Sequence, residues 1–524
     1  MLGFGFGLGF GSGFGRRPPI PSSALSPQRL SQNSGRGAGP GMDGRRGRIV
    51  QPAMSRPLSA NRSQMLLLPP CLDDFVPRQH PVRFVAEFVD ALPLSDMGFK
   101  VPDPESAGAP AYAPALLLCV WVYGWMDRVR TSRRLEAACL RDVTYMWIAG
   151  GHHPDHNTLW RFFRDNKKAL KAVFRKVVHV AVASDLVGFA LHAVDGTKIQ
   201  CASSTDTTWH RQKLNEKLKL LDEVINEQIA EAERSEQVED VSFAMPEQLR
   251  DREQLRSQVR EALAAMDRAD ADHLHPAEPE AQMMKLRGGQ NALSYNAQAV
   301  VDHDSDLIIA EDVVSDGSDN AQLVPMTQQV LDNTGQVADC TLGDGGYRSG
   351  EQLFEAEVRN FPVLVNMQEE AETKGSFAKS NFRYDQERDG YVCPLGQFLP
   401  FSKFSQNRGA REKLRVYRCR NKQCPQRDKC TSDKVGRTIR RSVYDETLQR
   451  HRELVERPQN KLKLSLRKEI IEHAFGVIKS NNGFRRFAVK GLAAASACWT
   501  LACTAFDLWK LYPHWVQRRL VMAV

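Results

Sequence analysis

Two long interruptions divide a series of short β-type segments in the middle of this 524-residue chain. The segments are residues 189–201, 295–302, 307–314, 340–343 and 363–365, in which apolar and β-branched residues prevail. The first interruption, 205–280, has a helical pattern, and the second, 371–441, is polar and contains many arginines and several cysteines. Strands mixed with helices and interrupted in this way predict one α/β domain with two insertions.

The rest of the sequence divides into a tail, an N-terminal helical region and two C-terminal helices. Residues 1–60 are rich in Gly, Pro, Ser and Arg and offer too little apolar surface to offset the entropy of ordering. From 64 to 185, apolar residues recur at spacings of three and four, which is typical of amphipathic helices. We therefore expect a disordered low-complexity tail, an all-α domain over 64–185, an α/β core beginning in 186–370, and two further core helices within 442–511.

Charge is unevenly distributed, although the net charge is only +8 at pH 7. The helical insertion is acidic, with eighteen Asp and Glu against eight Lys and Arg over 216–280. The second insertion is basic, with fourteen Lys and Arg against three acids over 401–441. A basic block of this kind can contact a phosphate backbone, whereas the acidic insertion cannot.

The chain lacks an uncharged apolar run of the roughly 18 residues needed to cross a bilayer. We interpret the longest apolar runs, 116–125 and 492–506, as buried helices and expect no membrane association. Seven cysteines are scattered singly among apolar residues, which is typical of buried thiols in a reducing cytoplasm. These are Cys71, Cys119, Cys139, Cys201, Cys340, Cys498 and Cys503.

Three acidic residues form a candidate catalytic set. Asp195 lies within the first strand pattern, Asp344 directly follows the strand at 340–343, and Glu472 lies in a C-terminal helix. A carboxylate among apolar residues is costly unless it is paired or binds a cation. Two aspartates from strands and one carboxylate from a helix suffice to hold two Mg²⁺ ions, the arrangement that promotes phosphoryl transfer.

Basic residues accompany Glu472 on its helix. Lys468 and Lys479 stand four residues before it and seven residues after it, so the three side chains are expected on one helix face. The carboxylate would meet a metal ion there, while the ammonium groups would contact phosphates.

Together these motifs resemble the bacterial insertion-sequence transposases that have an RNase H-like core and an Asp-Asp-Glu triad. The resemblance extends over about residues 67–511, with its motifs in one order along the chain. They are Phe75-Val76-Pro77, His153-Pro154-Asp155-His156-Asn157-Thr158, Val194-Asp195-Gly196, Tyr295-Asn296-Ala297-Gln298, Asp319 with Gln322-Leu323, Gly343-Asp344-Gly345-Gly346-Tyr347, and Ile471-Glu472-His473-Ala474-Phe475-Gly476 with Lys479.

The resemblance implies that Asp195, Asp344 and Glu472 are the catalytic triad of a metal-dependent DNA transposase. Such an enzyme cleaves strands at the ends of its element and joins them to target DNA. The resemblance further implies two Mg²⁺ or Mn²⁺ ions held by the triad, terminal-repeat binding by the helical domain, and a homo-oligomer on double-stranded DNA. A cytoplasmic protein that associates with the nucleoid is expected.

The helix that carries Glu472 departs from the Tyr-Arg-Glu-Lys signature of related transposases. Ser465 stands at the Tyr position and Lys468 at the Arg position, although Arg467 is adjacent; Lys479 matches the Lys position. We expect Arg467, Lys468 and Lys479 to contact DNA phosphates.

Two other functions remain open on the residues alone. One is a catalytically inactive or repurposed relative that only binds DNA, and the other is a nuclease that cleaves without joining. Asp302, Asp316 and Asp319 are competing carboxylates near the strands. For Asp316 and Asp319, which lie next to Gly317 and just before a helical pattern, we expect capping roles.

Four cysteines of the basic insertion form a second candidate site: Cys393, Cys419, Cys424 and Cys430. Four thiolates can hold Zn²⁺ in tetrahedral geometry and would thereby stabilise a segment with little apolar material of its own. The gaps of four residues after Cys419 and five after Cys424 are wider than in compact zinc motifs. Four reduced, unliganded thiols are the alternative.

A histidine-rich segment is a third candidate for metal binding. His152, His153, Asp155 and His156 precede a helix that begins near Asn157, so capping and turn roles are expected. The helix carries a basic face that suits phosphate contact, an ordinary solvated surface being the alternative. Its residues are Trp160, Arg161, Arg164, Lys167, Lys168 and Lys171.

Overall fold

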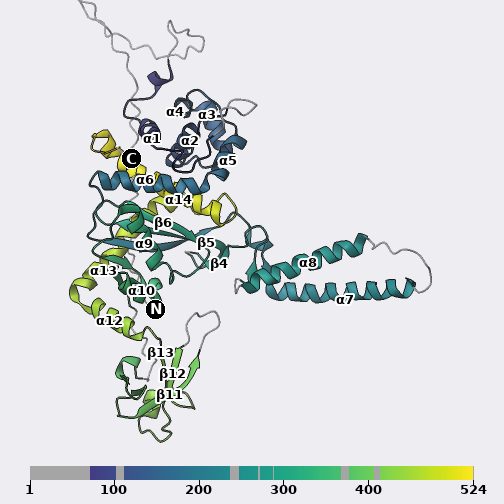
Figure 1. Cartoon of the computed structure of the whole chain (residues 1–524), viewed down its shortest axis with the longest axis vertical. Helices are drawn as coiled ribbons and strands as arrows, with labels where there is room; N and C mark the ends of the chain where they lie inside the picture. The colour runs from purple at the N-terminus through teal and green to yellow at the C-terminus, as the bar shows by residue number, and fades with distance from the viewer. Residues whose placement is uncertain are drawn as a thin grey trace, which may run out of the picture. The chain divides into compact units, whose positions relative to one another are not determined.

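The computed structural model describes residues 71–101, 111–236, 247–268, 272–286, 288–367, 377–405 and 414–522. The chain divides into two units, Met1–Leu67 and Leu68–Val524. The predicted low-complexity tail, 1–60, lies outside the described residues. All elements in Figure 1 belong to the second unit.

Helices make up the N-terminal part of this unit, as the periodicity predicts. Proline at the first helical position starts α1 and α2, and a Thr131 hydroxyl caps α3. The helix expected near Asn157 begins at His156, because the Asp155 carboxylate accepts the Thr158 N–H at 2.7 Å. The elements are η1 (Leu72–Phe75), α1 (Pro81–Asp90), α2 (Pro114–Met126), α3 (Ser132–Arg141), α4 (Val143–Ile148), α5 (His156–Asp165) and α6 (Lys167–Ala183).

A mixed sheet follows the helices. Strand β1 pairs antiparallel with β5 and parallel with β7, and β7 pairs parallel with β8. Strands β4 and β6 both pair antiparallel with β5, so the order is β4-β5-β1-β7-β8 with β6 also beside β5. All the strands predicted from the sequence are in this sheet; β4 was not predicted. Its strands are β1 (His192–Gln200), β4 (Gln282–Lys285), β5 (Asn291–Asp302), β6 (Ile308–Val314), β7 (Thr341–Gly343) and β8 (Val363–Val365).

Helices pack on this sheet. Helix α14 contacts β5 and β6 as well as α2 and α6, and α13 contacts β1, β5 and β7. Figure 1 shows α14 between α6 and the sheet. Among the described helices, α14 alone is long and apolar enough to cross a membrane, but 83% of its most apolar window is buried inside the protein, as predicted for 492–506. The helices are α9 (Leu323–Thr334), α10 (Gly350–Val358), α12 (Asp445–Glu456), α13 (Pro458–Gly476) and α14 (Leu492–Val516), with short turns η3 (Gly345–Tyr347) and η5 (Val477–Asn481, a π-helical turn).

Two helices, α7 (Arg211–Glu236) and α8 (Glu247–Arg268), lie between β1 and β4 in the sequence and contact each other. Leu214, Val259 and Met266 are buried between them, and Arg256 and Arg260 on α8 both pair with Asp222 on α7. The short elements η2 (Thr205–Thr207), β2 (Trp209–His210) and β3 (His273–Leu274) lie at the base of the pair, where β2 and β3 pair antiparallel.

The cysteine-bearing segment forms a second, antiparallel sheet that the sequence analysis did not predict. Its strand order is β13-β12-β11-β10-β9. The segment was expected to have little apolar material, yet one residue from each of β10 to β13 and one residue directly before β9 are buried together: Phe382, Tyr391, Leu399, Tyr417 and Ile439. The elements are η4 (Lys379–Asn381), β9 (Arg383–Asp385), β10 (Gly390–Val392), β11 (Phe398–Ser405), β12 (Leu414–Arg418), α11 (Arg427–Cys430) and β13 (Thr438–Arg441).

Candidate active site

Asp195 and Asp344 lie at the same level of two neighbouring parallel strands. The register of β1 and β7 pairs His192 with Thr341 and Ala193 with Leu342. Continuing it by two more residues places Asp195 beside Asp344, which directly follows β7. The sheet therefore brings together two carboxylates that are far apart in the sequence.

The Asp195 carboxylate is held in a mostly buried position, with 22% of its side chain exposed. Its Oδ1 accepts the Gly196 N–H at 2.7 Å, and its Oδ2 accepts a hydrogen bond from Arg467 Nη1 at 3.0 Å. Burial raises the pKa of Asp195 above its ordinary value; Arg467 opposes this shift and the Asp344 carboxylate adds to it. The site thus disfavours negative charge unless a cation is near.

Asp344 is fixed by the turn that follows it. Its Oδ1 accepts the Gly346 N–H at 2.7 Å and so caps the turn η3. A Cβ on Gly346 would lie 2.8 Å from the same oxygen, so the turn requires glycine there. The buried Tyr347 hydroxyl is next in the site: burial raises its pKa well above the usual value, and the charges of Asp319, Asp195 and Asp344 add to the shift.

Asp319 belongs to this site, although the sequence analysis assigned it a capping role. That assignment is wrong for its side chain: the carboxylate accepts hydrogen bonds from Asn296 Nδ2 and Gln298 Nε2 at 2.7 Å each, and from Lys198 Nζ at 3.1 Å. Gln298 in turn accepts the Tyr347 hydroxyl. The signal that could have found Asp319 is the pair of amide side chains, Asn296 and Gln298, two residues apart within a strand, which both need buried hydrogen-bond partners.

The close approach of the Asp319 side chain to β1 explains why residue 196 is a glycine. A Cβ on Gly196 would lie 2.3 Å from Asp319 Oδ1 and from Gln298 Nε2. Asp302 and Asp316, the other competing carboxylates, have other partners. Asp302 accepts the N–H groups of Gly188 and Ser305 and lies 3.5 Å from His192 Nε2, and Asp316 accepts the N–H of Ser318 in a local turn.

Glu472 lies on α13, which packs on β1 and β7, but its side chain points largely into solvent. It is 60% exposed and approaches Lys468 Nζ at 3.9 Å. Among the residues that the structure describes, no three His, Cys, Asp or Glu side chains are arranged so that they could hold a metal ion. The paired aspartates have the oxygen donors that Mg²⁺ or Mn²⁺ prefers, whereas Glu472 in this position does not complete the set.

The three basic residues expected to contact phosphates lie in different surroundings. Lys468 is 72% exposed. Lys479, in the π-helical turn, donates to Thr197 Oγ1 at 2.7 Å, and Arg467 is paired with Asp195. Lys468 and Glu472 share a helix face, as predicted; Lys479 lies beyond the end of α13 and contacts β1.

In the histidine-rich segment Asp155 has the capping role expected of it, whereas the His153 and His156 side chains contact α3. Asp155 caps α5, His153 Nδ1 lies 3.1 Å from the Cys139 carbonyl oxygen, and His156 Nδ1 lies 3.0 Å from Glu136 Oε2. On the basic face that follows, Arg164 pairs with Asp165, and Lys171 pairs with Asp312. These two pairs leave less free positive charge than the sequence suggests.

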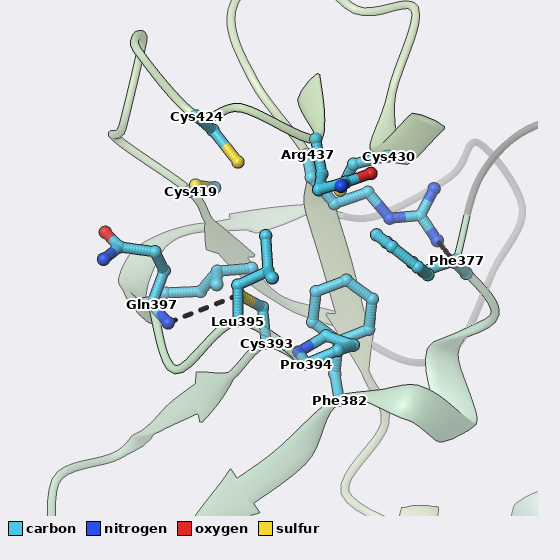
Figure 2. Close-up of a pocket in the computed structure, with 12 residues that line it drawn as sticks. Phe377, Phe382, Cys393, Pro394, Leu395, Gln397, Cys419, Cys424, Cys430 and Arg437 are labelled. Atoms are coloured by element: carbon cyan, nitrogen blue, oxygen red, sulfur yellow. Dashed lines mark hydrogen bonds between the residues drawn. The ribbon is translucent and has the colours of Figure 1, made fainter. Parts of the chain in front are cut away.

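The four cysteines of the second sheet line one pocket (Figure 2). They are Cys393, Cys419, Cys424 and Cys430, and none of them forms a disulfide.

Comparison with known protein families assigns two regions of the chain. Residues 70–165, which include α1 to α5, match the model described as a transposase domain (DUF772). Residues 392–512, which include α13 with Glu472 and nearly all of α14, match the model described as a transposase DDE domain. Among curated proteins, a search finds no match. A DDE domain implies an RNase H-like core, in agreement with the mixed sheet and its packed helices, and the two matches support an insertion-sequence DDE transposase.

Proposed function

We propose that this transposase cleaves the ends of its element and joins them to target DNA, with Asp195, Asp344 and Glu472 as the metal-holding carboxylates. One observation carries the proposal: Asp195 and Asp344 stand level on neighbouring parallel strands, against which the helix of Glu472 is packed. The desolvation of Asp195 supports the same role, because a cation would offset its cost.

Two side chains of α13 must move for the triad to form. Arg467 now supplies the positive charge beside Asp195, so it leaves that carboxylate when a metal ion binds. Glu472, exposed and only 3.9 Å from Lys468, turns toward the aspartates. When bound, two Mg²⁺ or Mn²⁺ ions supply the Lewis acidity that activates the attacking oxygen and stabilises the leaving one.

The surrounding basic residues then bind the DNA backbone. The exposed ammonium of Lys468, the released guanidinium of Arg467, and Lys479 contact phosphates on either side of the cleaved bond. Water attacks the phosphodiester first, and the freed 3′-hydroxyl attacks target DNA second. The helical N-terminal region binds the terminal repeats, and the protein acts as a homo-oligomer on DNA.

A cleavage assay on the DNA that flanks the protein's own gene tests this function. With Mg²⁺, the wild-type protein is expected to nick the element ends and to form joined products. Asp344→Asn should abolish both products and leave end binding intact, whereas the control Asp332→Asn, on the exposed surface of α9, should retain them.

Strand transfer by Asp344→Asn would refute the proposed triad. End binding without nicking by the wild-type protein would instead favour the catalytically inactive DNA-binding protein. That alternative draws on one observation, the exposed position of Glu472 away from the aspartates. Nicking without joined products would indicate a nuclease.

A further inference from the structure

Two loops of the second sheet bring four thiols around one pocket. Cys393 lies in the connection between β10 and β11, and Cys419 directly follows β12. Cys424 and Cys430 lie in the connection between β12 and β13, with Cys430 as the last residue of α11. Figure 2 shows the four side chains around the pocket.

The backbone of the first loop is shaped around its cysteine. Two backbone hydrogen bonds close the β10–β11 turn. The Cys393 N–H donates to the Gln397 carbonyl at 2.9 Å, and the Gly396 N–H donates to the Cys393 carbonyl at 2.9 Å. The Gln397 N–H then donates to Cys393 Sγ at 3.3 Å (Figure 2). A backbone donor aimed at sulfur stabilises a thiolate, as hydrogen bonds to metal ligands do.

The second loop is equally constrained. The Cys419 N–H donates to the Arg437 carbonyl at 2.9 Å, which closes the base of the loop. A Cβ on Gly436, whose φ is +114°, would lie 2.5 Å from the Cys419 carbonyl oxygen, so only glycine allows this approach. The two loops therefore present their thiols from fixed backbone positions.

The hydrophobic cluster of the second sheet is small. It has five buried residues, against a far larger cluster under the first sheet. Small units with so little core usually depend on a disulfide or a metal ion. Of the other seven cysteines, Cys71 is exposed and the remaining six are buried, whereas these four are partly exposed around a shared pocket.

We propose that Cys393, Cys419, Cys424 and Cys430 bind one structural Zn²⁺ ion. In the described part of the chain no group of three such side chains stands ready to hold a metal, so binding requires the thiols to turn toward the pocket centre. Each thiol releases its proton to solvent as its Zn–S bond forms, and no oxidant is involved. The ion ties the β10–β11 loop to the β12–β13 loop and so fixes the basic sheet.

The metal content of the purified full-length protein tests the site without DNA, so the result is independent of transposase activity. We expect about one Zn²⁺ per chain. The variants Cys393→Ser and Cys430→Ser should lose most of it, whereas the control Cys71→Ser, which changes an exposed thiol outside the pocket, should retain it.

Cobalt substitution of the wild-type protein gives a second measurement that needs no variant to fold. Co²⁺ bound by four thiolates should give the intense absorption of tetrahedral sulfur coordination, and adding Zn²⁺ should remove it. If zinc-free wild-type protein failed to show that absorption after Co²⁺ was added, the proposal would be overturned. Zinc retained by Cys430→Ser, or a disulfide among the four cysteines, would overturn it equally.

Discussion

Asp319 organises the polar side chains that surround the two strand-borne aspartates. Its carboxylate accepts hydrogen bonds from Asn296, Gln298 and Lys198. Gln298 in turn accepts a hydrogen bond from the Tyr347 hydroxyl. Its side chain is 19% exposed, and so is that of Lys198. A network in which most groups are satisfied and buried holds its members rigidly. We therefore expect Asp319 to position Lys198 and Tyr347 around the site.

Replacing Asp319 with Asn should impair the reaction more than the fold. The amide can keep one oxygen toward Asn296 and Gln298 but then turns its NH₂ toward the Lys198 ammonium, which loses its ion pair. We expect cleavage at the element ends to slow by about 10- to 100-fold, the usual effect of losing a group that orients catalytic ligands. The measurement is the rate at which the protein nicks element ends to which it is already bound. Its affinity for the end DNA should stay unchanged.

Asp316→Asn is the matched control, because its side chain serves only the Ser318 turn in the contacts observed. If Asp319→Asn nicked as fast as this control, the positioning role would be wrong. If Asp319→Asn lost thermal stability together with its nicking activity, the result would indicate a structural role alone.

Part of the site follows from sequence and part does not. Asp195 and Asp344 stand at strand positions that the pattern predicts, and the parallel register then brings them together. The position of Lys479 relative to Glu472 does not follow from residue spacing, because α13 gives way to a π-helical turn at Val477, between the two residues. The Asp319 contacts depend on β5 pairing with β1, which a single sequence does not encode locally.

At the level of elements, the packing of α14 on β6 buries two carboxyl groups. Glu311 on β6 is fully buried and accepts the Thr500 hydroxyl at 2.8 Å, while its second oxygen has no hydrogen-bond partner in the described residues. Asp507 on α14 accepts the Ile308 N–H at 2.9 Å. Burial raises the pKa of Glu311 from 4.5 to about 8, with Lys171 opposing the shift. Burial likewise raises the pKa of Asp507 well above its usual value.

The raised pKa of Glu311 predicts that wild-type stability falls as pH rises. The unfolded chain releases this proton near pH 4.5 and the folded protein near pH 8, so the stabilisation present below 4.5 is lost progressively up to 8. The contribution of this group has a slope of up to about 1.4 kcal/mol per pH unit. Glu311→Gln, which cannot ionise, should flatten that slope in urea unfolding measured between pH 5 and pH 8.

Glu351→Gln, on the exposed side of α10, provides the comparison. It should retain the wild-type pH dependence. A Glu311→Gln slope as steep as that of this control would show that Glu311 is ionised in the folded protein across the range.

The elements themselves divide in a similar way. Strands β1, β5, β6, β7 and β8 are predictable because their apolar and β-branched residues stand out against the flanking sequence. The second sheet is not, since the strand Thr438–Arg441, for example, has two arginines among its four residues and only Ile439 is fully buried. Short, basic strands of this kind depend on their neighbours in the sheet, which residue patterns do not reveal.

Across the whole second unit, the N-terminal helices and the first sheet share one hydrophobic cluster, which runs from Val76 to Leu511. Helix α14 is the shared element, because it contacts α1, α2 and α6 on one side and the sheet on the other. Two of its tryptophans also donate to the helices: Trp509 Nε1 to the Met126 carbonyl at 3.0 Å and Trp515 Nε1 to Glu87 at 2.9 Å. The helical region thus relies on the far end of the chain for its core.

This arrangement predicts that the helical region does not fold alone. A fragment of residues 71–185 lacks α14 and would expose the residues of α2, nearly all of which are buried in the whole protein. Circular dichroism should therefore show no cooperative thermal transition for the fragment, whereas residues 71–522 should unfold cooperatively. A fragment that melted cooperatively would mean that this region has a sufficient core of its own. In that case the terminal-repeat binding proposed for this region could be separated from catalysis. The shared hydrophobic cluster argues that it cannot be separated in this way.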